Sequence, residues 1–409
     1  MEVFVARQAI FNRQRELYAY ELLYRSNAAR NEFDGTDAGI ATRQVISSTV
    51  LSIGLENIMC GKRAFLNFDH ALLSDGMHLS LPKQAIVIEI LETVAPTQDL
   101  IALCRNIHDQ GYSIALDDFV WQPELEPLIG IAKLIKVDLM ATSKQEQERL
   151  LRTYRPRGIM MLAEKVETHE EFEWARDAGY DLFQGYFFAR PAIVRGRQIP
   201  AAQVTCLRLL QEIQRNDLDF DELERLIRGD VSLTFRLLRY ANSALFGRRE
   251  ETNSIARALL VLGEDGIRRW VSLATLPMLA TNKPSELATL SIVRARFCER
   301  LAQLSGTAQR GEAFMMGMFS LLDALIDCPL DDALREIHLR PPITEALLGI
   351  APKQDILASI YRLTRQYEIG DWDEVEKLSA EIGVPAAAVG GAYVESTLWA
   401  AGIAGQDGM

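Results

Sequence analysis

Seven short apolar stretches in the N-terminal half each carry a polar side chain able to bind a metal ion or a phosphate group. They span residues 18–23, 64–68, 86–92, 113–119, 134–139, 159–167 and 182–188. Each reads as a β-strand, and helical periodicity returns between them, with one helix expected at about 38–55. This alternation predicts a (β/α) barrel, in which the C-terminal ends of the strands meet at one face.

The polar residues of these stretches are the candidate site. Glu89 is the most telling, because it interrupts the apolar run Ile-Val-Ile-Glu-Ile-Leu. A buried carboxylate persists only when it is paired or bound to a metal ion. The alternative is that Glu89 forms only a structural ion pair with Lys136. That pair alone would not explain why the other apolar stretches also carry polar residues. Those are Glu21, Asn67, Asp117, Asp118 and Glu164.

The chain opens with two β-type runs, at 3–10 and 16–24, joined by a short polar segment. So short a connection permits only an antiparallel hairpin, because a parallel pair needs a crossover of about a dozen residues. The barrel is therefore expected to contain one antiparallel strand. In the second run Glu21 and Arg25 share one face, and a surface ion pair at a strand end remains an open alternative.

Composition and charge narrow the functional classes. The 409 residues have a net charge of −12, which argues against a general nucleic-acid surface. The five cysteines are scattered and show no CxxC spacing, so we expect reduced thiols in a cytoplasmic protein. No signal peptide and no apolar run of the roughly 20 residues that span a bilayer is evident.

A polar, proline-containing segment near 192–203 ends the β-type pattern, and helical periodicity continues to the C-terminus. We therefore expect an α/β barrel domain over residues 1–195 and an all-helical domain over 201–409. Asp230 is a candidate N-cap in the second domain, and the glycine-rich tail from Ala400 is expected to fray.

The first domain resembles the EAL domain, a bacterial phosphodiesterase domain that opens cyclic di-GMP with two Mg²⁺ or Mn²⁺ ions. The resemblance rests on motifs that occur in order: Arg7-Gln8-Ala9-Ile10, Glu21-Leu22-Leu23-Tyr24-Arg25, Asn67, Glu89-Ile90-Leu91-Glu92, Asp117-Asp118-Phe119, Lys136-Val137-Asp138, Ala163-Glu164-Lys165-Val166-Glu167 and Gln184-Gly185-Tyr186 with Pro191.

The resemblance implies a role for each matching residue. Glu21, Asn67, Glu89 and Asp117 would hold one metal ion, and Asp118 would reach a second. Lys136 would hold the attacking water or a phosphate oxygen, and Glu164 would coordinate metal or act as a base. Glu92, Glu167 and Gln184 would support the site, while Gln8, Arg25, Gln184 and Pro191 would contact the dinucleotide. Oxygen ligands of this kind suit hard divalent cations.

The chain also departs from the EAL pattern. Leu91 stands where a threonine is expected, and Lys165 where a glycine is expected. The Gly-Thr-Gly-Tyr-Ser-Ser stretch that follows Asp-Asp-Phe in active members is replaced by Val120 to Pro127. Because that loop organises the second metal and the dimer in active members, its loss argues against hydrolysis and leaves a homodimer as an open alternative.

The second half resembles the HDOD domain, an all-helical relative of HD-type phosphohydrolases. The resemblance rests on residues 230–247 and 255–263. Ser320 and Leu321 stand where a His-Asp pair would be expected, and His338 is the one histidine of this half. A hydrolase site is therefore not expected here, and the domain is interpreted as a scaffold for a protein partner.

Two functions follow from these resemblances. In the first, the barrel binds metal or cyclic di-GMP with little or no hydrolysis, and the helical domain relays the state to a protein partner. In the second, the barrel is an active Mg²⁺- or Mn²⁺-dependent phosphodiesterase that produces pGpG under the control of the helical domain.

Overall fold

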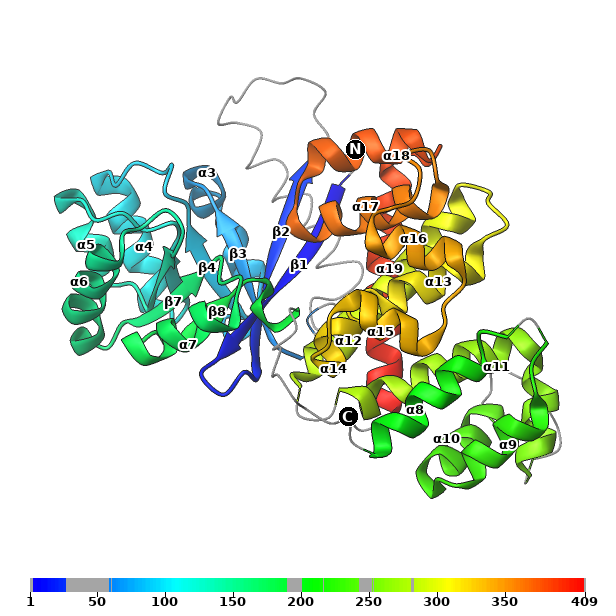
Figure 1. The fold of residues 1–409 in the computed structure, drawn as a ribbon. Helices are drawn as coiled ribbons and strands as arrows, with labels where there is room; N and C mark the ends of the chain where they lie inside the picture. Colours follow the sequence, from blue (N-terminus) through cyan, green and yellow to red (C-terminus); the bar gives the residue numbers. More distant parts are fainter. Residues whose placement is uncertain are drawn as a thin grey trace. The chain divides into compact units, whose positions relative to one another are not determined.

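The computed structural model describes residues 3–26, 59, 61–189, 201–215, 217–242, 252, 254–280 and 283–407. The helix expected at about 38–55 lies outside these residues. The chain divides into two compact units (Figure 1). The first comprises Met1–Arg190 together with Arg362–Asp407, and the second is Pro191–Tyr361.

Eight strands form a closed barrel in the first unit, in the order in which they occur in the chain. Every strand pair is parallel except the two that involve β1, which runs antiparallel to β2 and to β8. The predicted hairpin and barrel are therefore confirmed. The strands are β1 Val3–Asn12, β2 Leu17–Ser26, β3 Arg63–Phe68, β4 Ile86–Ile90, β5 Ser113–Leu116, β6 Leu134–Asp138, β7 Met160–Glu164 and β8 Leu182–Gln184.

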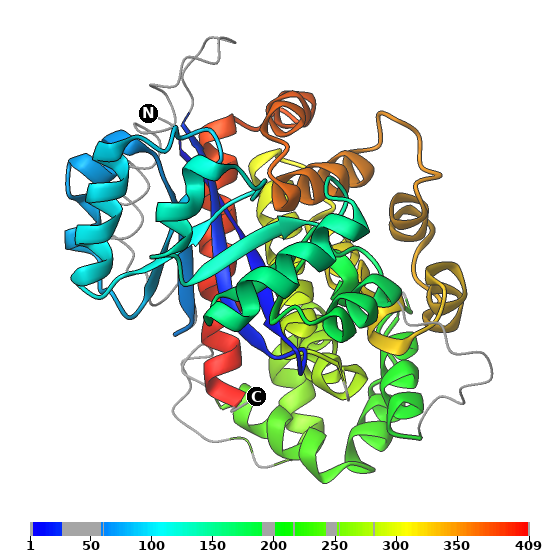
Figure 2. The ribbon, with the colours of Figure 1, turned by 90° about the vertical axis from the view of Figure 1, so that its left-hand side faces the viewer.

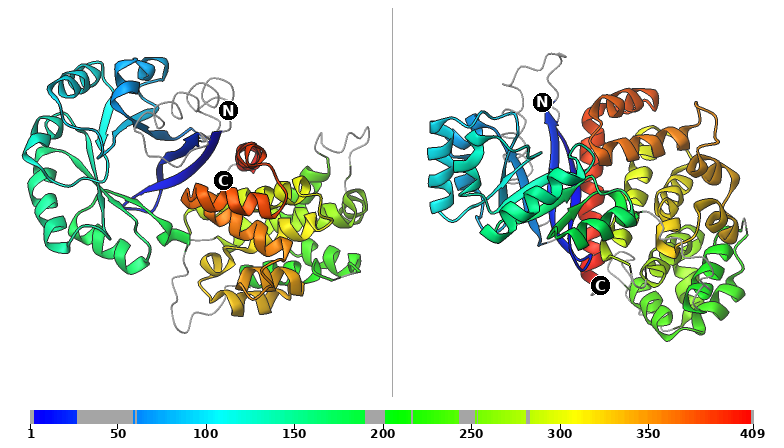
Figure 3. Two further views of the ribbon diagram at one scale, coloured as in Figure 1. Left: turned by 90° about the horizontal axis from the view of Figure 1, so that it is seen from above. Right: turned by 60° about the vertical axis from the view of Figure 1, so that its left-hand side comes forward.

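Helices surround the ring of strands, as the view from above shows (Figure 3). Side chains cap the longer ones: Thr97, Ser143 and Thr168 each accept a hydrogen bond from a backbone N–H of the first turn. The helices are α3 His70–Ser74, α4 Gln98–Asp109, α5 Glu126–Ile129, α6 Lys144–Tyr154 and α7 His169–Ala178, with short 3₁₀ turns at Met77–Ser80, Pro123–Leu125, Arg155–Arg157 and Tyr186–Ala189.

Apolar side chains fill the interior of the barrel. Ile10, Phe65, Val87, Leu134 and Leu162 belong to one buried cluster, to which every described strand contributes a residue. Such layers make a barrel a packed core rather than a pore. The polar residues of the strands follow this cluster toward the C-terminal strand ends, where they can form a site.

One strand is shorter than expected. The predicted run at 113–119 ends at Leu116, because Asp118 adopts a left-handed backbone conformation with φ of 38°. Asp117 still donates its backbone N–H to the Ile90 carbonyl, at 3.0 Å. The two adjacent aspartates therefore lie in the turn after β5, so strand alternation does not determine which way they face.

The second unit is helical, as predicted. Asp230 caps α10 by accepting hydrogen bonds from the Ser232 and Leu233 N–H groups. The helices of this unit are α8 Ala201–Glu212, α9 Phe220–Arg228, α10 Val231–Ala241, α11 Ile255–Leu279, with a break at Gly263, α12 Ser285–Leu304, α13 Arg310–Phe319, α14 Leu322–Ile326, α15 Leu330–Ile337 and α16 Pro341–Leu348. Of the helices that the structure describes, none is long and apolar enough to cross a membrane.

The C-terminal helices are α17 Ile356–Ile369, α18 Trp372–Glu381 and α19 Ala386–Asp407. The prediction that the tail frays from Ala400 is wrong for residues 400–407, because α19 continues to Asp407. From Arg362 onward the chain groups with the barrel, and α19 runs beside β1 (Figure 2). The domain boundaries expected at residues 195 and 201 stay a prediction. The division of the chain into two units places its last helices in the same unit as the barrel.

The side chain of Tyr367 in α17 connects the C-terminal helices to the barrel through hydrogen bonds. β1 pairs with β8 only at Ile10–Asn12, so the rest of that edge needs other partners. The Tyr367 hydroxyl donates to the Val5 carbonyl at 3.0 Å and accepts from the Val5 N–H at 3.1 Å. Its ring is fully buried and contacts Trp372 and Tyr393. One side chain thus satisfies both backbone groups of Val5.

We expect Tyr367→Phe to lower the free energy of unfolding by about 1–3 kcal/mol, because both Val5 groups lose their partner in a buried setting. Urea unfolding of the full chain measures this loss. Tyr361→Phe on the same helix is the matched control, because the Tyr361 hydroxyl makes no hydrogen bond within the described residues. Equal losses in the two variants would contradict the role given to Tyr367.

Candidate functional site

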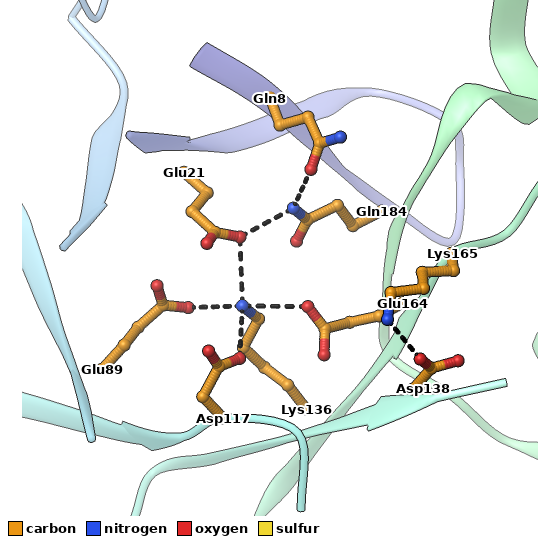
Figure 4. Close-up of polar contacts among 9 residues, drawn as sticks. All are labelled: Gln8, Glu21, Glu89, Asp117, Lys136, Asp138, Glu164, Lys165 and Gln184. Carbon is orange, nitrogen blue, oxygen red and sulfur yellow. Dashed lines mark hydrogen bonds and ion pairs between the residues drawn. The ribbon is translucent and has the colours of Figure 1, made fainter. Parts of the chain in front are cut away.

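Four carboxylates surround the ammonium group of Lys136 at the C-terminal ends of the barrel strands (Figure 4). The distances from Nζ are 3.0 Å to Glu21, 2.9 Å to Glu89, 2.7 Å to Asp117 and 2.9 Å to Glu164. We call these five residues the carboxylate cage.

Strand order brings the cage together. Glu21 lies on β2, Glu89 on β4, Lys136 on β6 and Glu164 on β7, and Asp117 follows β5. These strands all run in the same direction, so their C-terminal ends reach the same face. The ion pair between Glu89 and Lys136 considered from the sequence is present, but it is one of four.

Burial raises the free-energy cost of keeping the charges of the cage close together. Glu89 and Lys136 are fully buried, and Glu21 and Glu164 nearly so. Burial, and then repulsion from Glu21, raises the pKa of Glu89 well above its ordinary value. Burial alone would lower the pKa of Lys136, but the carboxylates, Glu164 foremost, hold it well above its ordinary value. Lys136 is therefore charged, and one positive charge is shared by four acids.

Glu164 should make the stability of the metal-free protein depend on pH. Burial is the main cause that raises its pKa to about 8, from 4.5. The folded state therefore keeps a proton that the unfolded chain releases above about pH 4.5, so stability should fall as the pH rises from 5 to 8. One such group contributes at most about 1.4 kcal/mol per pH unit.

We expect Glu164→Gln to make this pH dependence shallower, because glutamine cannot titrate, whereas Glu89, whose pKa is also raised, still can. Urea unfolding at pH 5, 6.5 and 8 in the presence of a chelator measures the slope. Glu173→Gln, at a half-exposed carboxylate paired with Arg15, should keep the parental slope. A slope that is unchanged in Glu164→Gln would show that Glu164 is not the titrating group.

Two glutamines extend the cage. The side-chain amide of Gln184 on β8 donates to Glu21 at 2.7 Å and to Gln8 of β1 at 2.6 Å. Gln8 also lies directly opposite Glu21 in the β1–β2 register. Gln184 thus contacts Oε2 of Glu21, the same oxygen that contacts Lys136.

The other predicted residues lie outside the cage. Asn67 is level with Glu89 on the neighbouring strand β3. Glu92 lines a cavity of about 400 Å³ together with Asp117 and Asp118. Glu167 follows β7, where its backbone N–H donates to Glu171. The side chain of Arg25, and the whole of Pro191, lie outside the described residues.

A second ion pair stands beside the cage and was not foreseen. Lys165 pairs with Asp138, which also accepts hydrogen bonds from the Met140 and Ala141 N–H groups. Burial would raise the pKa of Asp138, but these donors, Lys165 first, lower it. Lys165 has a φ of 55°, a conformation suited to the glycine expected there. The departure noted in the sequence was the one available signal of this pair.

Asp118 lies near this second pair. Burial and the charge of Asp117 raise its pKa, and the ammonium group of Lys165 opposes them. The cavity next to it is lined by Val120 and Gln122 of the replaced loop. The residue expected to reach a second metal ion therefore lies among charged groups of both signs, and the ammonium group of Lys165 is one of them.

The cage has the donor chemistry for a hard divalent cation. Glu89 Oε2 and Glu164 Oε2 are buried and have no hydrogen-bond partner within the described part of the chain. Four carboxylates with one ammonium group leave an excess of negative charge. Yet among the residues described, no three His, Cys, Asp or Glu side chains are arranged to hold a metal ion. The Lys136 ammonium contacts the four carboxylates that could hold such an ion.

The second unit shows a different arrangement at the position of the expected His-Asp pair. Ser320 is buried, and its hydroxyl donates to the Gly317 carbonyl and accepts from Nη1 of Arg294, at 3.1 Å. A permanently charged guanidinium group thus contacts the residue that stands in place of the histidine.

Comparison with known proteins agrees with both resemblances. The EAL domain model matches residues 63–191, and the HDOD domain model matches residues 199–331. Cyclic di-GMP phosphodiesterase CdgJ of Vibrio cholerae is 35% identical over 97% of this chain and 92% of its own length. The uncharacterized protein YuxH of Bacillus subtilis is 34% identical over 93% of this chain and 94% of its own.

A solved structure shows a weaker likeness. Klebsiella pneumoniae BlrP1, in a complex with calcium and cyclic di-GMP, is 24% identical, with a TM-score of 0.38. That match covers 47% of this chain and 56% of the BlrP1 chain. Because two relatives match almost the full length at more than 30% identity, the chain belongs to the EAL–HDOD family of cyclic di-GMP phosphodiesterase-like proteins.

Proposed function

We propose that the barrel binds cyclic di-GMP and a divalent cation with little or no hydrolysis, and that the HDOD domain passes the bound state to a protein partner. The observation that carries this proposal is the carboxylate cage, in which Lys136 already holds all four acids at 2.7–3.0 Å. A cation must compete with this ammonium group for the same oxygens.

The proposed residues keep the roles that the family resemblance implies. Glu21, Asn67, Glu89 and Asp117 would hold one ion, which would supply a positive charge near a phosphate of the ligand. Gln8, Arg25, Gln184 and Pro191 would contact the dinucleotide. Glu92 and Glu167 would support the site, Lys136 would orient a phosphate oxygen or water, and Glu164 would take up a proton.

Hydrolysis is proposed to be weak because the residues that would hold a second metal ion have altered surroundings. Burial and the charge of Asp117 raise the pKa of Asp118, and Val120 replaces the small residues expected after Phe119. Losing one well-placed electrostatic contact in a transition state typically slows a reaction by about 100- to 1,000-fold. Binding in the ground state does not require that contact, so it can survive.

An active phosphodiesterase is the second candidate. Two observations favour it: four of the acids implied by the resemblance contact Lys136, and the 35% identical relative is named a cyclic di-GMP phosphodiesterase. In that case Lys136 would move aside when the cation binds, and Glu164 would act as the base.

Calorimetry and product analysis on one sample distinguish the two candidates. Cyclic di-GMP is titrated into the full chain with and without Mn²⁺, and pGpG is then quantified. We expect saturable binding and turnover at least about 100-fold below that of an active EAL enzyme measured alongside. Multiple turnovers within minutes, abolished by Glu21→Ala, would establish the enzyme instead.

Metal binding has its own test. The double variant Glu89→Gln, Asp117→Asn should lose Mn²⁺ binding in calorimetry, because it removes two charged oxygen ligands. Glu173→Gln is the control for a carboxylate outside the cage. Unchanged Mn²⁺ affinity in the double variant would exclude the cage as the metal site.

A further inference from the structure

A cavity of about 470 Å³ lies within the helical unit Pro191–Tyr361. Its walls come from the two residues that follow α8, the middle of α11, and parts of α12, α13 and α16. Four arginines line it, against three acids, although the whole chain carries a net charge of −12. We call it the arginine cavity; its arginines are Arg268, Arg269, Arg310 and Arg340.

Two acids of the cavity wall form ion pairs with arginines. Glu299 pairs with Arg269 and also with Arg296, at 2.7 Å, so two guanidinium groups hold one carboxylate. Glu312 pairs with Arg340 at 3.2 Å. The third acid, Asp265, is exposed. Arg268 pairs with Glu264, which lies outside the wall, at 3.6 Å. The wall itself keeps one more arginine than acids.

Two arginines repel each other across the cavity. The pKa of Arg268 is lowered first by burial and then by the charge of Arg340, while Glu264 and Asp265 oppose both effects. Arg268 donates to the Arg215 carbonyl at 2.7 Å and to the Ile213 carbonyl, which holds its guanidinium group in place at the wall. An anion between Arg268 and Arg340 would relieve this repulsion.

The first turn of α13 adds positive potential. Arg310 begins this ten-residue helix, and its side chain makes no ion pair with any residue that the structure describes. The N-cap residue Gln309 makes no side-chain hydrogen bond to the helix. Free N–H groups at a helix start attract anions. Beside them Gly311 leaves open space, with no atom within 4 Å of where a Cβ would be.

The remaining wall is apolar. Phe314, Met315, Ile213 and Ile343 line the cavity, and the Phe314 ring lies 4.9 Å from the guanidinium carbon of Arg269. A ligand that fits this wall has an apolar or aromatic body as well as a charged end.

We infer that the arginine cavity binds a small organic phosphate. Guanidinium groups present paired N–H donors that match phosphate oxygens, and a phosphate dianion supplies the negative charge that the wall lacks. Its organic body packs against Phe314 and Met315. The HDOD unit is then a sensor of a small molecule in its own right, which goes beyond the function proposed for the barrel.

Phenyl phosphate is the probe, titrated into the full chain by calorimetry at constant ionic strength. We expect saturable binding with a Kd below about 1 mM, and at least about 10-fold weaker binding of inorganic phosphate, which lacks the apolar body. Binding of benzoate with equal affinity would overturn the preference for phosphate. Absence of saturable binding up to about 10 mM would overturn the site.

Variants locate the binding. Arg310→Gln, at an exposed position, and Arg340→Gln should each weaken phenyl phosphate binding by about 10-fold or more, because each removes a charged donor. Arg335→Gln, at an exposed arginine of α15 outside the cavity, is the matched control. An equal loss in Arg335→Gln would reveal non-specific attraction. Glu89→Gln in the barrel should leave phenyl phosphate binding unchanged, which separates this site from the carboxylate cage.

Discussion

Replacing Lys136 with methionine is expected to lower the free energy of unfolding of the metal-free protein by about 3–5 kcal/mol at neutral pH. Lys136 is fully buried and contacts four carboxylates, so its removal leaves their charges with no cation between them. The loss should be larger at pH 9, because the pKa of about 8 leaves Glu164 mostly protonated at neutral pH and ionised at pH 9. Urea unfolding with a chelator at both pH values measures it.

Lys165→Met is the matched control, because it removes the same charge from a lysine that is 55% exposed. Exposed ion pairs contribute about 0–1 kcal/mol, so the loss there should be small. Mn²⁺ should raise the stability of Lys136→Met more than that of the parent, because the centre of the cage is then open to a cation. Equal losses in the two methionine variants would refute the role assigned to Lys136.

Gly185→Ala is expected to destabilise the barrel by about 4 kcal/mol or more, at the upper end of what single substitutions cost. Gly185 follows β8 with a φ of 145°, and a Cβ there would lie 2.5 Å from the Val166 backbone nitrogen and closer still to its carbonyl oxygen. Both Val166 groups already bond to Gln184 and Phe187. The two backbones therefore cannot separate without breaking these bonds.

Gly158→Ala provides the comparison, because Gly158 also has a positive φ, of 80°, but open space around its Cβ position. It should cost about 1–2 kcal/mol, the penalty of the left-handed backbone alone. Urea unfolding of both variants measures the difference. Similar costs would mean that β8 can shift away from Val166.

The barrel and its acids were predictable, because strands and helices have different apolar periods and an acid inside an apolar run stands out. Glu89 and Lys136 both showed this signal. The central place of Lys136 was not predictable, because it depends on barrel closure, which brings β2 and β6 together across 115 residues of sequence. The early end of β5 was missed because the left-handed conformation of Asp118 leaves no trace in strand alternation.

The C-terminal segment was hard to assign for a similar reason. Tyr367 lies in an ordinary amphipathic helix, and the apolar periodicity of that helix does not indicate which strand Tyr367 contacts. Lys165 gave a partial signal, since a lysine replaced an expected glycine, but its pairing with Asp138 required the folded geometry. Local pattern thus predicts elements, and long-range partners need the three-dimensional structure.

The contact between Tyr367 and Val5 joins residues 362 positions apart, and this has a consequence for synthesis on the ribosome. Domains usually fold as they emerge, N-terminal first, at about 5–20 residues per second. Here the first strand must wait on the order of 20–70 seconds for its last partner to be translated. During that interval the exposed edge of β1 is a place for chaperones to bind or for nascent chains to associate.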